Sequence, residues 1–122
     1  MTSPRSLVVK CTCGAEAPER CAQAFTVAGT ALAAGAQVAM WLTGEAVWFA
    51  VPGCAEAFEL PHSPPLSELR DAVLSAGTLT VCTQCAARRE LTQDELLPGV
   101  RIAGAASFVD ETLRDGVQAL VY

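Results

Sequence analysis

Short apolar, β-branched runs alternate with helix-like segments along this chain, and this alternation limits its possible folds more than any other feature. The runs lack the one-in-two polar spacing of a half-exposed strand, so each is expected to be buried on both faces. Such strands are typical of parallel sheets covered by helices. The five expected strands are residues 7–12, 37–43, 78–83, 100–103 and 117–122.

Helical patterns fill the intervals between these strands. Pro18 suits the first turn of a helix, and Cys21, Phe25, Ala28 and Leu32 then follow at spacings of four, three and four residues, on one buried stripe. Further helices are expected at 66–76, 84–89 and 107–115, with Ser107 as a cap, whereas 44–51 is ambiguous and 54–65 irregular. The pattern predicts one α/β domain over residues 1–122, a three-layer sandwich with a mostly parallel five-stranded sheet and helices on both faces.

The charge and composition restrict the partners of such a domain. Eight basic and thirteen acidic side chains give a net charge of −5, so we expect no nucleic-acid binding. Residues 21–44 carry no charge, but they divide into two pieces that are each too short to span a bilayer, so no membrane segment is expected. With 52% hydrophobic and only 17% charged residues, some apolar surface is expected to be buried in a homo-oligomer.

Six cysteines are the chemically informative residues. The N-terminus lacks the pattern of a secretion signal, so a cytoplasmic location is expected, where cysteines serve as packing residues, metal ligands or reactive thiols and not as a disulfide framework. Cys21 lies on the apolar helix stripe and is expected to be a core residue. Cys54 has no partner nearby in the sequence, and His62, the single histidine, lies between prolines in an expected surface loop.

Cys82 and Cys85 are the strongest candidates for chemistry. They fall where the third expected strand turns into a helix, and in parallel α/β sheets reactive groups gather at the carboxyl ends of strands. A helix N-terminus lowers the pKa of a nearby thiol, and the CxxC spacing permits Cys85 to resolve an oxidised or persulfidated Cys82. Arg88 and Arg89 follow within two turns and are candidates to hold an anionic sulfur species.

Cys11 and Cys13 end the first expected strand and form a second candidate pair. In a flavodoxin-like strand order, the first and third strands are neighbours, so this pair is expected to approach Cys82 and Cys85. The four thiols would then exchange sulfur, or bind zinc or an iron–sulfur cluster through four thiolates. The remaining alternative is that the cysteines only pack and the chain is a non-catalytic subunit of an oligomer.

Two blocks of the sequence resemble the DsrE/DsrF-like family. The first runs from CTCGAEAPERC to LTGEAVWF, and the second from VCTQCAARRE to VQALVY, so the resemblance covers nearly the whole chain. In the second block the family places a cysteine at the end of a strand, followed by a small-residue helix and an arginine.

The resemblance implies a flavodoxin-like fold, a cytoplasmic location and an assembly of three or six copies. It also implies a sulfur relay protein, which carries sulfane sulfur as a persulfide and exchanges it with donor and acceptor proteins without a cofactor. The carrier position of the motif falls on Cys82. This chain departs from the family in the Cys11-Thr12-Cys13 segment and in Arg89-Glu90, where the family often has glycine after the arginine.

Overall fold

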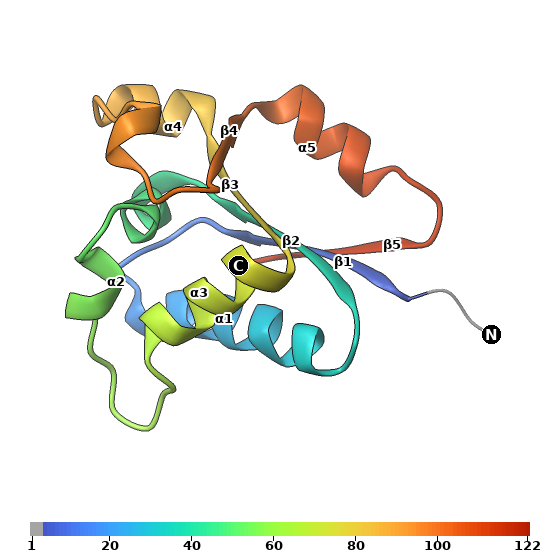
Figure 1. Cartoon of the computed structure of the whole chain (residues 1–122), viewed down its shortest axis with the longest axis horizontal. Helices are drawn as coiled ribbons and strands as arrows, with labels where there is room; N and C mark the ends of the chain where they lie inside the picture. The colour runs from blue at the N-terminus through green and yellow to red at the C-terminus, as the bar shows by residue number, and fades with distance from the viewer. Residues whose placement is uncertain (1–3) are drawn as a thin grey trace.

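A five-stranded parallel sheet forms the centre of the protein (Figure 1). The computed structural model describes residues 4–122. All neighbouring strands pair in parallel, in the order β4-β3-β2-β1-β5. The strands are β1 (Ser6–Cys11), β2 (Gln37–Leu42), β3 (Thr78–Cys82), β4 (Arg101–Ala103) and β5 (Val117–Val121). The α/β class and the parallel five-stranded sheet are confirmed.

The expected adjacency of the first and third strands is wrong, because β2 lies between β1 and β3. The first three crossovers add β2, β3 and β4 one after another on the same side of β1. The last crossover alone returns the chain across the sheet and places β5 on the far side of β1. The hydrophobic pattern predicts which segments are strands, but it carries no information about which strands are neighbours.

Helices cover both faces of the sheet. In Figure 1, α1 (Pro18–Ala33) and α3 (Leu66–Ala76) lie below the sheet, whereas α5 (Ala105–Thr112) lies above it and α4 (Thr83–Arg88) sits at its upper left. The helix α1 begins at Pro18, and Cys21, Phe25 and Ala28 are buried on the predicted stripe. At Gly29 a Cβ atom would lie 2.8 Å from Leu69 Cδ2, so the missing side chain lets α1 and α3 pack closely.

Side chains alternate between the two faces of the strands. Val9, Met40 and Val81 belong to the core beneath α1 and α3, together with Cys11, Leu42 and Leu79. On the other face the Trp41 ring packs edge-to-face on Phe108 of α5, with centroids 5.3 Å apart. The Glu111 carboxylate accepts hydrogen bonds from Trp41 Nε1 at 3.1 Å and from Arg101 Nη2 at 2.6 Å, which fixes α5 to the sheet.

The connecting segments settle what the sequence left open. The ambiguous residues form a 3₁₀ helix, η1 (Gly44–Ala50), and the segment expected to be irregular contains one short helix, α2 (Cys54–Ala57). The expected cap at Ser107 is wrong, because Gly104 occupies the N-cap position and α5 begins at Ala105. Thr92 and Glu95 form a capping box at a short 3₁₀ turn, η2 (Gln93–Glu95). Within residues 4–122, no helix is both long and apolar enough to cross a bilayer.

Candidate functional site

Cys82 lies at the carboxyl end of β3 and is the N-cap residue of α4. Its backbone is extended, with φ −62° and ψ 129°, and the chain turns into the helix at the next residue. The side chain is half-buried, so its sulfur remains accessible. Cys82 thus occupies the position that the sequence predicts, where a strand end meets a helix start.

Several groups around Cys82 favour its thiolate. Burial raises the pKa of Cys82, but hydrogen bonds from the Cys85 backbone amide, the Cys85 thiol and the Gln84 backbone amide outweigh that effect, and the charge of Lys10 adds to them. The net pKa of Cys82 therefore lies below its ordinary value. Because the thiolate is the nucleophilic form, the lowered pKa makes Cys82 the reactive member of the pair.

Cys85 lies in the first turn of α4 and its side chain is buried. Its sulfur accepts a hydrogen bond from the Gly44 backbone amide at 3.2 Å, and Arg88 Nη1 lies 4.0 Å away. Gly44 has φ +56°, and a Cβ atom there would lie 2.7 Å from the Thr12 carbonyl oxygen, so this position favours glycine. The turn after β2 thereby reaches Cys85 with a backbone donor that a larger residue would displace.

The two predicted arginines have different surroundings. Arg88 approaches the Cys85 sulfur, as described above. Arg89 instead pairs with Glu45, with Nε 2.8 Å from Oε2, and donates from Nη1 to the Cys85 carbonyl oxygen at 3.1 Å. Hydrogen bonds from Arg89 and Trp48 hold the pKa of Glu45 below its ordinary value. Arg89 therefore ties α4 to η1, whereas Arg88 lies next to the thiol pair.

Lys10 is a contributor that the sequence analysis missed. It lies on β1, on the face that α5 covers, and its Nζ is 4.7 Å from the centroid of the Phe108 ring. From this position its charge lowers the pKa of Cys82, two strands away. A lysine next to Val8 and Val9 in an otherwise apolar strand is itself a signal, because charged residues are rarely placed in buried strands without a purpose.

Cys11 and Cys13 do not join this site, so the expected convergence is wrong. Cys11 is fully buried in the core beneath α1, whereas Cys82 follows Thr80 onto the opposite face of β3. The intervening β2 also separates β1 from β3 by two strand spacings, about 10 Å. In residues 4–122, no three cysteine, histidine or acidic side chains are arranged to hold a metal ion. The four-thiolate metal site is therefore not assembled.

Cys11 and Cys13 form a separate thiol cluster with Cys21 of α1. The Cys21 thiol donates a hydrogen bond to the Cys11 sulfur and lowers the pKa of Cys11, while the same bond raises the pKa of Cys21. Cys11 Sγ lies 3.2 Å from the Cys13 carbonyl oxygen, and burial raises the pKa of Cys13 to about 11. We call this the buried thiol cluster. All three side chains are buried, as expected for Cys21, so they are shielded from reagents.

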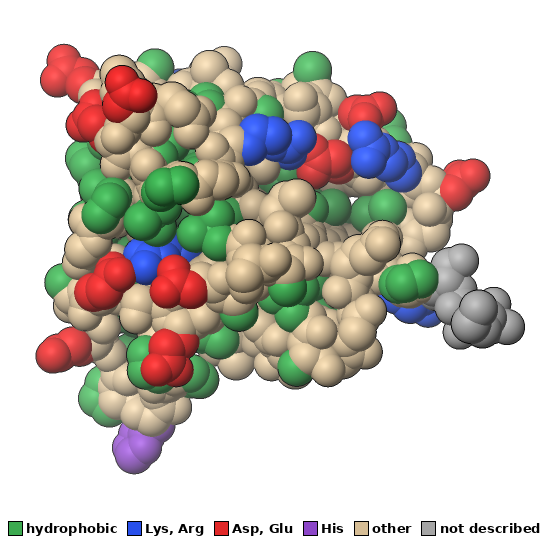
Figure 2. All heavy atoms as spheres, in the orientation of Figure 1, with side chains coloured by type: hydrophobic (Ala, Val, Ile, Leu, Met, Phe, Trp, Pro, Cys, Tyr) green, Lys and Arg blue, Asp and Glu red, His purple; other side chains and the backbone are tan. Residues whose placement is uncertain are grey.

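Cys54 and His62 both lie away from the cysteine pair in sequence and in the fold. Cys54 begins α2 and is half-buried, which makes it the other accessible thiol besides Cys82. His62 is exposed in the loop between α2 and α3, with φ +64°. In Figure 2 the histidine, coloured purple, projects from the lower tip of the molecule. The structure gives it no role at the thiol pair.

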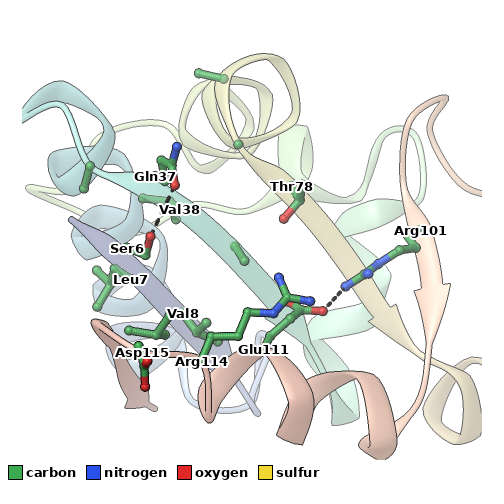
Figure 3. A pocket seen from close by; sticks show the side chains of 15 residues that line it. Ser6, Leu7, Val8, Gln37, Val38, Thr78, Arg101, Glu111, Arg114 and Asp115 are labelled. Carbon is green, nitrogen blue, oxygen red and sulfur yellow. Dashed lines mark hydrogen bonds and ion pairs between the residues drawn. The ribbon is translucent and has the colours of Figure 1, made fainter. Parts of the chain in front are cut away.

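A hollow lies at the opposite edge of the sheet. It has a volume of about 620 Å³ and is lined by the amino ends of β1, β2 and β3 and by the end of α5. Figure 3 shows its charged side chains, where Arg101 and Glu111 pair across one wall. The hollow contains no cysteine.

These features define a class: a parallel α/β protein with a half-exposed, thiolate-favouring cysteine at a strand end and a second cysteine one helical turn later. A model of the DsrE/DsrF-like family matches residues 6–120, and the chain belongs to this family. The fold is similar to that of the ychN protein from E. coli, with a TM-score of 0.78 at 14% sequence identity, over 98% of this chain and 100% of that one.

A second similar structure is MTH1491 from Methanobacterium thermoautotrophicum, a protein of unknown function. Its TM-score is 0.63 at 13% identity, again over 98% of this chain and 100% of that one. At these identities the likeness concerns the fold alone. A comparison with curated proteins gave no match.

Proposed function

We propose that the protein is a sulfur carrier that holds sulfane sulfur as a persulfide on Cys82. Membership of the DsrE/DsrF-like family supports sulfur relay in general. The observation that carries the finer assignment is the environment of Cys82, whose accessible sulfur receives backbone and thiol hydrogen bonds and whose pKa is lowered. These donors stabilise a thiolate, and they would equally stabilise the anionic persulfide formed from it.

Loading is a transfer of one sulfur atom without net redox change. The Cys82 thiolate attacks the outer sulfur of a donor persulfide, and a bond forms between Cys82 Sγ and that sulfur. The sulfur–sulfur bond of the donor breaks, and the donor leaves as a thiolate with the bonding electron pair. Unloading is the same step with an acceptor thiolate as the attacking group and Cys82 as the leaving group. A low thiol pKa makes Cys82 a good leaving group in this second step.

Cys85 is the positioning partner in this proposal. Its thiol donates to Cys82, while the Gly44 amide and Arg88 surround its own sulfur. If Cys85 attacked the inner sulfur of a loaded Cys82, hydrosulfide would leave and a Cys82–Cys85 disulfide would form, which a thiol reductant must then reduce. The Cys85 side chain is buried, so it is not itself open to the thiol of a donor or acceptor protein.

The proposal extends to the setting of the relay. We place it in the cytoplasm, where reducing conditions keep thiols free; all six cysteines are free in the structure. The partners are a sulfur donor protein and an acceptor protein, each of which presents a thiol at the open edge of the sheet. An assembly of three or six copies remains a prediction.

Native mass spectrometry of the full chain, before and after exposure to glutathione persulfide, tests the proposal. We expect a gain of one sulfur per chain that a thiol reductant removes. The gain should disappear in Cys82→Ser and persist in the matched control Cys54→Ser, because Cys54 is the other accessible thiol. Undiminished loading of Cys82→Ser would refute the assignment. A protein that takes up no sulfur at all would instead be a non-catalytic subunit, and bound metal in elemental analysis would revive the metal site.

The role of Cys85 is measured separately in the same experiment. Cys85→Ser should still load sulfur, but its persulfide should release no hydrosulfide on standing. Equal hydrosulfide release from Cys85→Ser and from the unmodified chain would show that Cys85 does not resolve the persulfide.

A further inference from the structure

The buried thiol cluster takes no part in the proposed carrier site. Cys11 ends β1, Cys13 follows two residues later, and Cys21 lies in the first turn of α1. No side chain of the cluster is more than 4% exposed. A single buried cysteine usually acts as a small packing residue, but three together place reactive groups next to one another. The cluster therefore offers a chemistry that is separate from that of Cys82.

Cys11 and Cys21 are the members of the cluster that contact each other through their sulfur atoms. The Cys11 side chain lies on the core face of β1, and Cys21 belongs to the buried stripe of α1, which covers this face. The Cys21 thiol donates a hydrogen bond to Cys11, which favours the Cys11 thiolate and lowers its pKa. Two thiols in hydrogen-bond contact need only a small movement to become a disulfide.

The cluster adjoins a surface turn, residues 12–17, which connects β1 to α1. Thr12, Ala15 and Glu16 are exposed in this turn, whereas Cys13 is buried. The turn therefore shields the thiols from the bulky thiol of another protein. Local opening of a single turn is a small fluctuation, and it suffices to admit hydrogen peroxide, which is little larger than water.

The same turn contacts the segment that reaches the carrier site. The Thr43 amide donates to the Cys11 carbonyl oxygen at 2.9 Å. Gly44 packs against the Thr12 carbonyl oxygen so closely that a Cβ atom would lie 2.7 Å from it. The Gly44 amide in turn donates to Cys85 Sγ at 3.2 Å. Two peptide units after β2 thus connect the end of β1 to the carrier pair, and in Figure 1 these segments meet at the left side of the fold.

We propose that Cys11 and Cys21 are a peroxide-sensitive dithiol, and that its oxidation to a disulfide slows the reactions of Cys82. A covalent bond holds two sulfur atoms closer than a hydrogen bond does, so the end of β1 moves towards α1. The turn at Gly44 follows the strand end and withdraws its amide from Cys85. A thiol that accepts a hydrogen bond is a better donor, so the bond from Cys85 to Cys82 weakens and the Cys82 thiolate is less favoured.

The oxidation balances with hydrogen peroxide as the oxidant. The Cys11 thiolate attacks one peroxide oxygen; a sulfur–oxygen bond forms, the oxygen–oxygen bond breaks, and hydroxide leaves and takes up the proton that Cys11 released. The Cys21 sulfur then attacks the sulfenic acid on Cys11. The sulfur–sulfur bond forms, the sulfur–oxygen bond breaks, and the leaving hydroxide takes the Cys21 proton. The thiol pair loses two electrons, and the peroxide is reduced to two waters.

This proposal concerns Cys82 only as a nucleophile, so it goes beyond the sulfur carrier function and does not depend on it. A chain that carries no sulfur can still form the disulfide, and a chain that loads sulfur normally can lack it. Alkylation of Cys82 by iodoacetamide reports its reactivity without any sulfur transfer. The two proposals therefore fail in different experiments.

Tryptic mapping of the full chain after exposure to hydrogen peroxide tests for the disulfide. Trypsin separates residues 11–20, which contain two cysteines of the cluster, from residues 21–70, which contain the third, and from residues 71–88, which contain the carrier pair. In a Cys54→Ser background, we expect a cross-link between the first two peptides that a reductant removes. It should persist in Cys13→Ala and disappear in Cys11→Ala.

The reactivity of Cys82 is then measured on the same oxidised sample. Peroxide also oxidises the accessible Cys82, so the sample is first treated briefly with thioredoxin, a protein reductant too large to reach the buried disulfide. Alkylation of Cys82 by iodoacetamide at neutral pH should then be at least about twofold slower than in the untreated chain. The matched control Cys21→Ala, in the same background, should show no such decrease.

A small phosphine reductant should restore the alkylation rate of the oxidised sample, so the test does not depend on whether a core variant folds. Absence of the cross-link would overturn the proposal, as would a link within residues 11–20 or a link that survives in Cys11→Ala. A cross-linked chain whose Cys82 reacts as fast as before would also overturn it, because the contact through Gly44 would then transmit nothing. An equal decrease in the Cys21→Ala control would attribute the slowing to oxidation elsewhere and would refute the proposal.

Discussion

Replacement of Arg70 by alanine should remove a large part of the stability of this protein. Arg70 is 2% exposed, on α3, and its guanidinium contacts three acceptors from different segments. It binds the Glu56 carboxylate through Nη2 at 2.7 Å and Nη1 at 3.1 Å, and the Asp71 carboxylate through Nε at 3.0 Å. Nη1 also donates to the Phe49 carbonyl oxygen at 3.4 Å. One side chain thereby joins η1, α2 and α3.

The magnitude follows from what the substitution removes. The two outer methylenes of the buried stem contribute about 0.8 kcal/mol each, and the lost hydrogen bond leaves the Phe49 carbonyl without its donor, which costs about 1 kcal/mol. Glu56 and Asp71 are half-exposed or more, so their ion pairs are screened and add little. We therefore expect Arg70→Ala to lower the free energy of unfolding by about 3 kcal/mol. Arg70→Met keeps an apolar stem and should cost about 1 kcal/mol.

Urea unfolding followed by far-ultraviolet circular dichroism measures both variants, and the midpoint should move while the slope stays constant. A loss of less than about 1 kcal/mol for Arg70→Ala would refute the reasoning, because the buried stem would then contribute no packing. Equal losses for the alanine and methionine variants would show that the charge, and not the stem, supplies the stability.

Two further predictions concern charged side chains. A hydrogen bond from Arg70 lowers the pKa of Glu56 from 4.5 to about 2. The Glu56 carboxylate therefore contributes its full stabilisation above pH 4.5 and loses it as the pH falls towards 2. From pH 5 to pH 2, the free energy of unfolding of the unmodified chain should fall more than that of Glu56→Gln. Equal falls for the two chains would contradict this. Lys10→Gln should raise the pKa of Cys82 and slow its alkylation by iodoacetamide at neutral pH in a Cys54→Ser background, whereas Arg20→Gln on α1 should not. Equal alkylation rates for Lys10→Gln and Arg20→Gln would remove Lys10 from the site.

Local sequence signals predicted the elements of this fold and the position of Cys82. Pro18 and the apolar stripe after it marked α1, because the helix start and the stripe both depend on residues near in sequence. The same local signals placed Cys82 and Cys85 where a strand turns into a helix.

What the sequence could not predict depends on contacts between distant segments. The strand order decides that β2 separates Cys11 from Cys82, and no local pattern encodes that order. Val109 and Leu113 form a helical stripe, but Phe108 and Glu111 are the residues of α5 that face the sheet, so the stripe points outward. The effect of Lys10 on Cys82 likewise arises only when β1 and β3 lie in one sheet.

The separation of the thiols by β2 bears on how much cargo one chain would carry under the proposed function. A persulfide sulfur passes to any thiolate within reach, so six neighbouring cysteines would exchange the bound sulfur among themselves. Here the buried thiol cluster lies on the other side of the sheet, with the turn at Gly44 between it and the carrier, and Cys54 stands apart on α2. A loaded chain would therefore hold a single sulfur atom at the Cys82–Cys85 pair, and the number delivered to an acceptor would equal the number of chains that dock.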